Sequence, residues 1–219
     1  TSNWIEELGG KLSSYNIFTS NNTTNQILIA TKKDMNVKAI YQWKSSYSEN
    51  RPDYLEVTIE EENYDLSIIG TRILVDNYNY FKLEEVNTEM KNRKKQCDFL
   101  INRIKKLVDR GNLIIGGGDF NTARRNNENK YWNREILKKE LGNNIELCTP
   151  EGCSYQPYKG EYAGCPDHLL YSNKIIVEAQ PYNWDFVKRD TDIYPERELT
   201  SKIPNPYPDH AMIKASFKI

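Results

Sequence analysis

A short apolar run that ends in three consecutive glycines constrains the fold of this chain more than any other stretch. Residues 113–115 include two β-branched side chains and residues 116–118 are all glycine, a pattern typical of a buried strand that opens into a tight turn. Asp119 and Asn121 come next. Polar side chains at the end of a buried strand are costly unless they are paired or used. These two residues therefore either bond their own backbone in a turn or belong to a functional site.

The composition indicates a globular chain rather than a disordered or membrane-spanning one. Its 219 residues are 38% hydrophobic and 28% charged, and no apolar run approaches the ~18 residues of a spanning helix. We expect one domain over residues 1–219, because no linker or repeat divides the chain. The net charge of −1 excludes a globally basic protein, so any contact with nucleic acid needs a local patch.

The four cysteines do not form a zinc module, since none of their spacings gives a Cys-x-x-Cys pair. Cys97 lies on the apolar side of a predicted helix and is expected to be a buried thiol. Cys148, Cys153 and Cys165 either pair or stay free, and both alternatives remain open.

Hydrophobic periodicity predicts a mixture of strands and helices. Apolar runs at residues 55–59 and 66–75 flank a turn at Glu62 and Asn63, which indicates an antiparallel hairpin. A long amphipathic helix is expected over residues 84–109, with Gly111 as its stop. Other strands are predicted at 26–31, 37–43, 113–115, 175–177, 184–187 and 211–219, and shorter helices at 4–12 and 132–142. This order favours a mixed α/β fold of two sheets packed face to face with helices outside.

Both histidines of the chain, His168 and His210, close a Pro-Asp-His triplet in front of an apolar strand. If the sheets bring these strand starts close to the strand end at Asp119, one mouth holds several carboxylates and both imidazoles. A carboxylate that orients an imidazole produces a general base or a group that holds a phosphate oxygen. Further carboxylates supply hard oxygen ligands for Mg²⁺ or Mn²⁺. A single Asp-His pair is more often a hydrogen-bonded turn, so the prediction rests on the three clusters together.

In this order the motifs resemble those of the endonuclease/exonuclease/phosphatase superfamily, the group of pancreatic-type DNases, abasic-site endonucleases, sphingomyelinases and inositol polyphosphate phosphatases. The resemblance runs from about residue 25 to the end of the chain. Residues 118–121 are similar to the family's Gly-Asp-Phe-Asn, and residues 167–172 to its Asp-His/Tyr-apolar-apolar-x-Ser. Residues 209–210 are similar to the end of its terminal Ser-Asp-His motif. Arg93-x-x-Gln96 also resembles a helix feature of the family.

This resemblance implies a four-layer α/β sandwich of two packed mixed sheets with outer helices, and metal-dependent cleavage of a phosphoester. His210, held by Asp167, would act as the general base or orient the phosphate. Asp119 would orient or activate the attacking water, and Asn121 would bind a phosphate oxygen. Asp209 would lie at the metal ion, which is expected to be Mg²⁺ or Mn²⁺.

The start of the chain departs from the family pattern. The family opens with a strand that carries an Asn-x-Asn-like motif and a strand that ends in Gln-Glu, whose glutamate is the main metal ligand. Neither is recognisable before residue 25. A decayed metal site is one explanation. We expect instead that the N-terminal strands are missing from this chain, because it begins with Thr1 rather than methionine.

A second departure is Arg72, which stands where many members carry a histidine after a threonine. An arginine does not donate a proton at ordinary pH because its pKa lies above about 12, but it can hold a phosphate in a bidentate fork. Arg72 is therefore expected either to contact phosphate or to be a surface residue at a strand end. Arg124 and His168 are the other expected phosphate contacts, although solvation is the commoner explanation for a loop arginine such as Arg124.

Three functions stay open from the sequence. The first is a metal-dependent phosphodiesterase, most simply a DNA endonuclease or exonuclease that cleaves by attack of water. The second is a phosphatase of the same superfamily that acts on a small or lipid-linked phosphate. The third is an inactive relative that binds a phosphorylated partner. DNA is the favoured partner, and we expect a monomer without a membrane span, in the cytoplasm.

Overall fold

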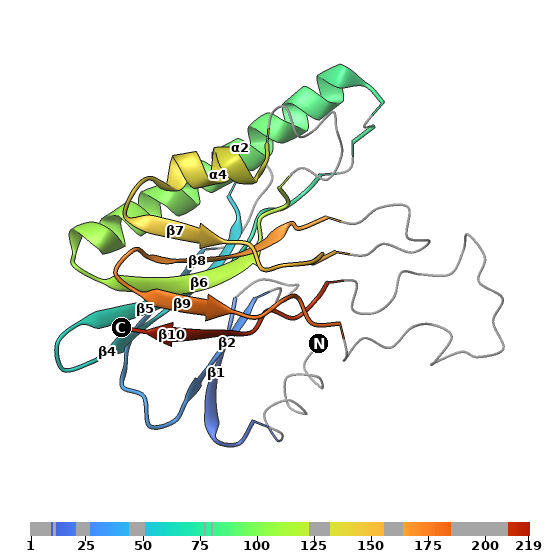
Figure 1. Ribbon diagram of the computed structural model, residues 1–219. Coiled ribbons are helices and arrows are strands. Elements are labelled where there is room, and N and C mark those ends of the chain that lie inside the picture. Colours follow the sequence, from blue (N-terminus) through green and yellow to red (C-terminus); the bar gives the residue numbers. More distant parts are fainter. Residues whose placement is uncertain are drawn as a thin grey trace, which may run out of the picture.

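The computed structural model shows a mixed α/β molecule in which a large sheet lies between helices and two smaller sheets (Figure 1). The helix expected at residues 4–12 and the strand expected at 184–187 fall almost entirely outside the residues that the structure describes. The structure describes residues 10, 12–20, 27–43, 51–76, 78–79, 81–122, 132–155, 164–184 and 210–219.

The large sheet has six strands in the order β3-β4-β5-β6-β8-β7. The two central strands β5 and β6 are parallel, and the other neighbouring pairs are antiparallel. Parallel neighbours need a long crossover connection, which here is the helix α2. The bounds of the strands are β3 (Val37–Trp43), β4 (Asp53–Glu60), β5 (Asp65–Arg72), β6 (Leu113–Asp119), β7 (Ile145–Cys148) and β8 (Asp167–Ser172).

The hairpin of β4 and β5 forms as its sequence predicts. The backbone N–H of Glu61 donates to the carbonyl of Tyr64 at 2.9 Å and closes the turn. From there the register runs without interruption to the pair Asp53 and Arg72 at the far end of the hairpin. Asp53 begins β4 and Arg72 ends β5, so the two charged residues lie side by side at one end of the hairpin.

The long predicted helix is confirmed as α2 (Leu83–Asp109), which covers one face of the large sheet (Figure 1). Its inner stripe, including Cys97, Leu100 and Ile104, is buried in the main core against strand residues such as Ile114. Cys97 is thus the buried thiol that was expected. The second helix, α4 (Arg134–Leu141), starts at Asn133, whose side chain accepts a hydrogen bond from the backbone of the first turn.

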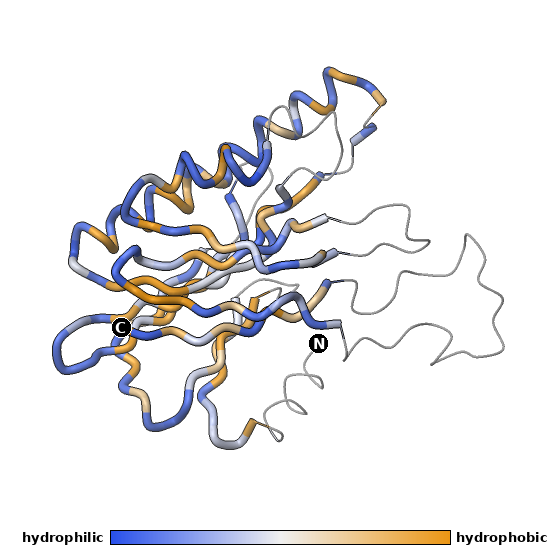
Figure 2. Tube along the Cα trace, viewed as in Figure 1, coloured by the Kyte–Doolittle hydropathy of each residue, from blue (hydrophilic) through white to orange (hydrophobic). Residues whose placement is uncertain are grey.

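Two small sheets lie on the opposite side of the large sheet from the helices (Figure 1). One pairs β1 (Tyr15–Thr19) with β2 (Leu28–Lys32), and the other pairs β9 (Ile176–Ala179) with β10 (Ala215–Lys218). Apolar residues beside and within β2 pack onto the outer face of β4, and Figure 2 shows hydrophobic colour concentrated along the strands where the layers meet. A side chain at Gly70 would come within 2.6 Å of Ile27, so this glycine permits the close approach.

The glycine triplet differs from its prediction, because it is part of β6 rather than a turn after it. Both edges of β6 are paired, with β5 on one side and β8 on the other. A methyl group at Gly118 would overlap the carbonyl of Thr71, and the φ of Gly118 is +153°. The glycines therefore serve close strand packing and carry the strand up to Asp119.

The described residues form three layers of the expected sandwich: helices, the large sheet, and the small sheets. The sequence analysis does not predict β1 and β7, which are strands of only five and four residues that pair with a neighbour along their length. Among the described helices, none is long and apolar enough to cross a membrane.

Candidate active site

A row of charged residues crosses four neighbouring strands of the large sheet, at the end where β5 and β6 finish and β4 and β8 begin. The register pairs Asp53 with Arg72, Arg72 with Asp119, and Asp119 with Asp167. Paired residues of neighbouring strands project from the same face of a sheet. Leu55 and other residues of the same parity in β4 pack on the small sheet, so the row faces the side away from α2. The fold thus gathers three carboxylates and a guanidinium at the mouth that the sequence predicts.

His210 joins this row from the last part of the chain. Its Nδ1 lies 2.8 Å from Oδ2 of Asp167. The backbone next to His210 is anchored by Ala211, whose N–H donates to the carbonyl of Ser154 at 2.8 Å, and the ring of Tyr155 lies 5.1 Å from the imidazole. A carboxylate at Nδ1 favours the tautomer with the proton on Nδ1, which turns Nε2 away from Asp167. This pair has the geometry of an oriented imidazole.

Asp167 is held by contacts on its own backbone. Its N–H donates to Oγ of Ser154 at 3.2 Å, and its carbonyl accepts a hydrogen bond from the hydroxyl of Tyr182 at 2.6 Å. The Asp167 side chain is only 13% exposed, so the carboxylate that orients His210 is largely shielded from solvent.

Asp119 and Asn121 form a tight unit at the end of β6. The backbone N–H of Asn121 donates to Oδ1 of Asp119 at 2.9 Å, and its Nδ2 donates to Oδ2 at 2.9 Å and to the carbonyl of Ile73 at 2.8 Å. Asn121 also adopts a φ of 44°, which is uncommon outside glycine and best tolerated by asparagine. Both Nδ2 hydrogens are therefore engaged within the protein, and the carboxamide orients Asp119. The contact that the sequence predicts between Asn121 and a phosphate would require one of these bonds to open.

The carboxyl group of Asp119 has an unusual proton affinity. Burial is the main cause that raises the pKa of Asp119 to about 6, and the charge of the nearby Asp167 carboxylate is the second. The charge of His210, the N–H of Asn121 and the charge of Arg72 act in the opposite direction. A carboxylate with a pKa near neutrality is suited to proton transfer, because both of its protonation states are accessible.

Arg72 lies beside this carboxylate and forms a long ion pair with it. Its Nε is 3.8 Å from Oδ2 of Asp119, and its side chain is 46% exposed. A partly exposed guanidinium at the edge of an acidic row is accessible to an anion from solvent. The position suits the phosphate contact that the sequence predicts, and proton donation from Arg72 stays excluded by its chemistry.

His168 stands apart from the other predicted residues. It is fully buried, and its two ring nitrogens bond the hydroxyls of Thr122 at 3.0 Å and Thr149 at 2.8 Å. Burial lowers the pKa of His168 to about 4, so the ring is neutral at physiological pH. Because neighbouring residues in a strand point to opposite faces, His168 lies behind the sheet while Asp167 faces the site. A neutral, enclosed imidazole cannot reach a phosphate, and this corrects the phosphate contact predicted for His168.

Two predicted site residues, Asp209 and Arg124, lie outside the described residues. All four cysteines are free thiols, which decides the alternative left open for Cys148, Cys153 and Cys165 in favour of unpaired residues.

The described side chains do not form a metal site by themselves. Within the described ranges, no group of three or more histidine, cysteine, aspartate or glutamate side chains is placed to hold a metal ion. Asp119 and Asp167 already accept hydrogen bonds from Asn121 and His210. A divalent ion at this mouth would therefore need further ligands from outside the described residues.

Asp53, Ser154 and Tyr182 belong to the surroundings of the site but are not predicted from the sequence. The sequence could have located Asp53, because a hairpin centred on the predicted turn at Glu62 and Asn63 pairs residue 53 with residue 72, as the structure does. Ser154 and Tyr182 carry no comparable signal, since only the folded chain brings them to the backbone of Asp167.

No protein-family model matches the sequence, and no curated protein matches it either. Solved structures do match its fold. D. rerio TDP2 complexed with a single-strand DNA product has a TM-score of 0.64 at 12% identity, over 99% of this chain and 82% of that one. An endonuclease/exonuclease/phosphatase family protein from Bacteroides thetaiotaomicron has a TM-score of 0.57 at 13% identity, over 99% and 80%. A Staphylococcus aureus beta toxin mutant with bound magnesium ions has a TM-score of 0.59 at 12% identity, over 98% and 81%.

Proposed function

Because the chain has the fold of the endonuclease/exonuclease/phosphatase superfamily, we propose that it is a phosphoester hydrolase with its reaction centre at Asp119, Asp167 and His210. The observation that carries this proposal is the 2.8 Å contact between His210 and Asp167, at the same strand edge as a carboxyl group whose pKa is raised to about 6. An oriented imidazole and a carboxyl group whose pKa lies near neutral pH are suited to the activation of water by proton transfer.

Each residue of the site has a distinct role in this proposal. Asp167 fixes the ring of His210, which holds a phosphate oxygen or takes a proton at Nε2. Asp119, oriented by Asn121, positions the attacking water and accepts its proton. Arg72 offsets the charge that develops on the phosphate oxygens. Positioning and charge neutralisation of this kind supply most of the catalysis in phosphoryl chemistry.

A divalent metal is part of the proposed activity. The beta toxin structure with bound magnesium ions shows that a protein of this fold binds magnesium, which supports Mg²⁺ or Mn²⁺ as the cofactor. When bound, such an ion polarises the phosphate and neutralises its charge. Asp209 remains the predicted ligand from this chain. Removal of divalent ions with EDTA is expected to abolish hydrolysis, and added Mg²⁺ or Mn²⁺ is expected to restore it.

Among substrates, nucleic acid is favoured over a small phosphate. D. rerio TDP2 is seen with a single-strand DNA product, which supports a nuclease or phosphodiesterase acting on DNA. A phosphatase that acts on a small or lipid-linked phosphate is the second candidate, because the exposed Arg72 can hold a phosphate of either kind.

The test is a comparison of substrates with matched variants. Full-length protein is incubated with plasmid DNA, a single-stranded oligonucleotide and inositol phosphates in the presence of Mg²⁺ or Mn²⁺. We expect DNA cleavage that His210→Ala and Asp119→Ala abolish and that Glu178→Gln, on an exposed position of β9, leaves intact. Equal cleavage by all four proteins would overturn the proposed site. Phosphate release from inositol phosphates without DNA cleavage would establish the phosphatase instead.

A further inference from the structure

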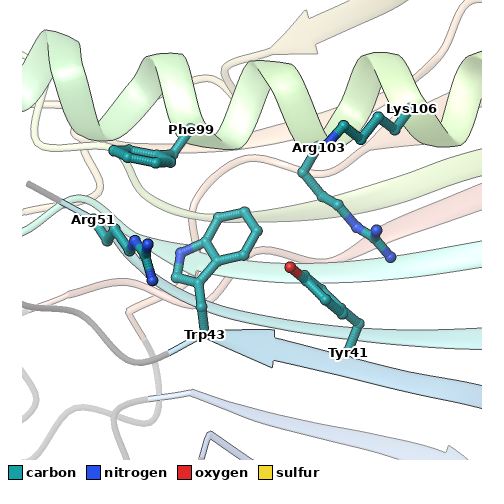
Figure 3. Close-up of a pocket in the computed structure, with 6 residues that line it drawn as sticks. All are labelled: Tyr41, Trp43, Arg51, Phe99, Arg103 and Lys106. Carbon is teal, nitrogen blue, oxygen red and sulfur yellow. The ribbon is translucent and has the colours of Figure 1, made fainter. Parts of the chain in front are cut away.

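The hollow between β3 and α2 is lined by side chains that already engage other protein groups (Figure 3). The guanidinium of Arg103 forms a bidentate pair with Glu56, at 2.7 and 2.8 Å, and lies 3.8 Å from the ring centroid of Tyr41. Trp43 stacks on the buried Tyr54 with a centroid distance of 4.2 Å. These contacts hold the edge of the sheet against the helix. More reactive groups lie close to the charged row, where two cysteines come together.

Cys153 and Cys165 lie opposite each other across a short antiparallel pairing. Tyr155 and Gly164 form a bridge in which each backbone N–H donates to the carbonyl of the other residue, at 3.0 and 3.3 Å. The N–H of Ser154 donates to the same Gly164 carbonyl at 3.0 Å. Two successive residues that oppose one partner residue make a β-bulge. Because the bulge takes up Ser154, Cys153 comes level with Cys165.

Both thiols point into the gap between the two paired segments. Sγ of Cys153 donates to the carbonyl of Gly164 at 3.1 Å, and Sγ of Cys165 donates to the carbonyl of Gly152 at 3.1 Å. Each thiol thus contacts the peptide group that leads into the other cysteine. Opposed residues of antiparallel strands have Cα atoms roughly 4.5–5.5 Å apart, within the roughly 4.4–6.8 Å that a disulfide spans.

The two cysteines are accessible to a small oxidant. Both are partly exposed free thiols, whereas Cys97 is buried under α2. Burial raises the pKa of the Cys165 thiol, and the nearby Cys153 raises it further, against the opposing effect of the Ser154 N–H. Because the thiolate is the reactive form, oxidation of this pair should be slow at neutral pH and faster as the pH rises.

The cysteine pair belongs to the segments that hold Asp167 and His210 together. Cys165 stands two residues before Asp167. Ser154, which follows the other cysteine, accepts the N–H of Asp167 at its Oγ and the N–H of Ala211 at its carbonyl, at 3.2 and 2.8 Å. Ala211 directly follows His210. A displacement of the bulge therefore changes the support of both catalytic side chains at once.

We propose that Cys153 and Cys165 form a reversible disulfide that acts as a redox switch. The S–S bond replaces the thiol contacts with the carbonyls of Gly152 and Gly164 and draws the two segments together at the bulge. Ser154 then loses the position from which it supports the catalytic pair. The disulfide itself is independent of the proposed hydrolysis, whereas its effect on turnover rests on that proposed function.

The oxidant that balances this reaction is a peroxide. One thiolate attacks a peroxide oxygen, the O–O bond breaks, and a sulfenic acid forms with release of water. The second thiol then attacks the sulfur of the sulfenic acid, so that the S–S bond forms and a second water leaves. Two thiols thus lose two electrons and two protons, and hydrogen peroxide becomes two water molecules. A dithiol reverses the change by exchange and is itself oxidised to a cyclic disulfide.

The first measurement locates the bond without reference to activity. The full-length protein is reduced with dithiothreitol, freed of the reductant, treated with hydrogen peroxide, alkylated at its remaining thiols and mapped by mass spectrometry of its peptides. We expect a link between Cys153 and Cys165 that dithiothreitol removes. Cys153→Ser and Cys165→Ser should each abolish this link. Cys148→Ser, at another partly exposed cysteine, is the matched control and should keep it.

A link that persists in Cys153→Ser, or the absence of any link in the wild-type protein, would overturn the proposal. Serine keeps a donor for the same carbonyl oxygen, so both variants are expected to fold. If one of them fails to fold, the other still identifies the pair.

The second measurement follows the geometry of the site by amide NMR. The N–H signals of Asp167 and Ala211, which both bond Ser154, should move on oxidation and return on reduction. They should do so in the wild-type and Cys148→Ser proteins but not in Cys153→Ser. Unmoved signals in a fully disulfide-bonded protein would overturn the switch.

The third measurement is turnover of the substrate that the reduced protein hydrolyses. Oxidation should lower the rate roughly 10- to 100-fold, the effect of a misplacement of about 1 Å, and dithiothreitol should restore it. An unchanged rate in the fully oxidised protein would also overturn the switch. Absence of hydrolysis by the reduced protein would instead contradict the proposed function, while the peptide map and the amide signals would still decide the disulfide.

Discussion

The Nδ1 atom of His210 lies 2.8 Å from Oδ2 of Asp167, although 43 residues separate the two side chains in the sequence. Asp167 starts a strand in the large sheet, and His210 pairs with Tyr155 in a short bridge at the same edge. The contact joins the last part of the chain to the sheet that holds Asp119. It is the relationship on which the proposed chemistry most depends.

Substitution of Asp167 tests this relationship. Asp167→Asn keeps the shape of the side chain but removes the charge that stabilises the imidazolium, so we expect kcat/KM to fall by roughly 100- to 10,000-fold, the range of a lost general acid-base contribution. His210→Ala should cost a similar factor, and the double variant little more, because the two residues act as a unit. Steady-state hydrolysis measures this, with Glu178→Gln as control. Independent, multiplicative losses would show that the pair does not work together.

The raised pKa of Asp119 predicts a pH dependence of activity. If the ionised carboxylate accepts the proton of water, activity should rise with pH and reach half its maximum near the pKa of about 6. The charge of Arg72 lowers this pKa, so Arg72→Gln should move the half-maximum to higher pH, besides any loss of rate. Arg110→Gln, beyond the end of α2, should leave the profile unmoved. A profile that Arg72→Gln does not shift would contradict the role of Asp119.

Burial of His168 predicts a loss of stability in acid. The folded protein keeps the ring neutral down to about pH 4, whereas the unfolded chain binds a proton near 6.5. The unfolded state thus holds more protons between these values, and the free energy of unfolding should fall by up to about 3 kcal/mol as the pH drops from 6.5 to 4. Urea unfolding at pH 7 and pH 5 measures this. The His168→Gln protein should be less stable than the wild type at pH 7, and its free energy of unfolding should fall much less between pH 7 and pH 5.

Asp119 acts on stability with the opposite sign. Its folded-state pKa of about 6 lies above the value of 3.8 for the unfolded chain, so the folded protein holds more protons in this range and gains stability as the pH falls from 6 to 4. The two groups partly cancel in the wild-type protein. In the same urea experiment, Asp119→Asn should therefore be the variant that loses stability most steeply in acid. If the free energy of unfolding changed with pH in both variants as it does in the wild type, the pKa shifts assigned to His168 and Asp119 would both be refuted.

A buried ion pair on α2 supports the turn that carries Asn121. Nε of Arg93 lies 3.1 Å from Glu89, and Nη1 donates to the carbonyl of Asn121 at 2.8 Å. Both side chains are buried, so Arg93→Met leaves the charge of Glu89 without its partner and should destabilise the protein by about 3–5 kcal/mol. Arg93→Met combined with Glu89→Gln should recover part of this loss. Thermal or urea unfolding measures both.

The same variants separate stability from positioning. Activity of Arg93→Met at a temperature where it is fully folded should stay reduced, because the Asn121 turn has lost its contact with the helix. Lys95→Met, at an exposed position of α2, is the matched control. Full activity of folded Arg93→Met would show that the turn keeps its geometry without the helix.

The sequence determines the hairpin of β4 and β5, the helix α2 and the apolar start of β6, because each depends on local periodicity and on turn residues within a short stretch, whereas the continuation of β6 through its glycines to Asp119 is not predicted. It also marks residues 118–121, 167–168 and 209–210 as chemically important, since such clusters of polar residues at strand boundaries are costly without a use. The short strands β1 and β7 are not determined in this way, because five and four residues are too few for a clear periodicity and each strand takes its place by pairing with a neighbour.

Only the tertiary structure decides which of these residues reach the charged row and which are buried in the core. Asp167 and His168 are neighbours in sequence, but strand alternation sends one to the charged row and the other into the core between Thr122 and Thr149. Cross-strand register likewise brings Asp53 into the row and places Arg72 next to Asp119. The physical reason is that register and layer packing are properties of the assembled sheet, which no local stretch of the chain contains.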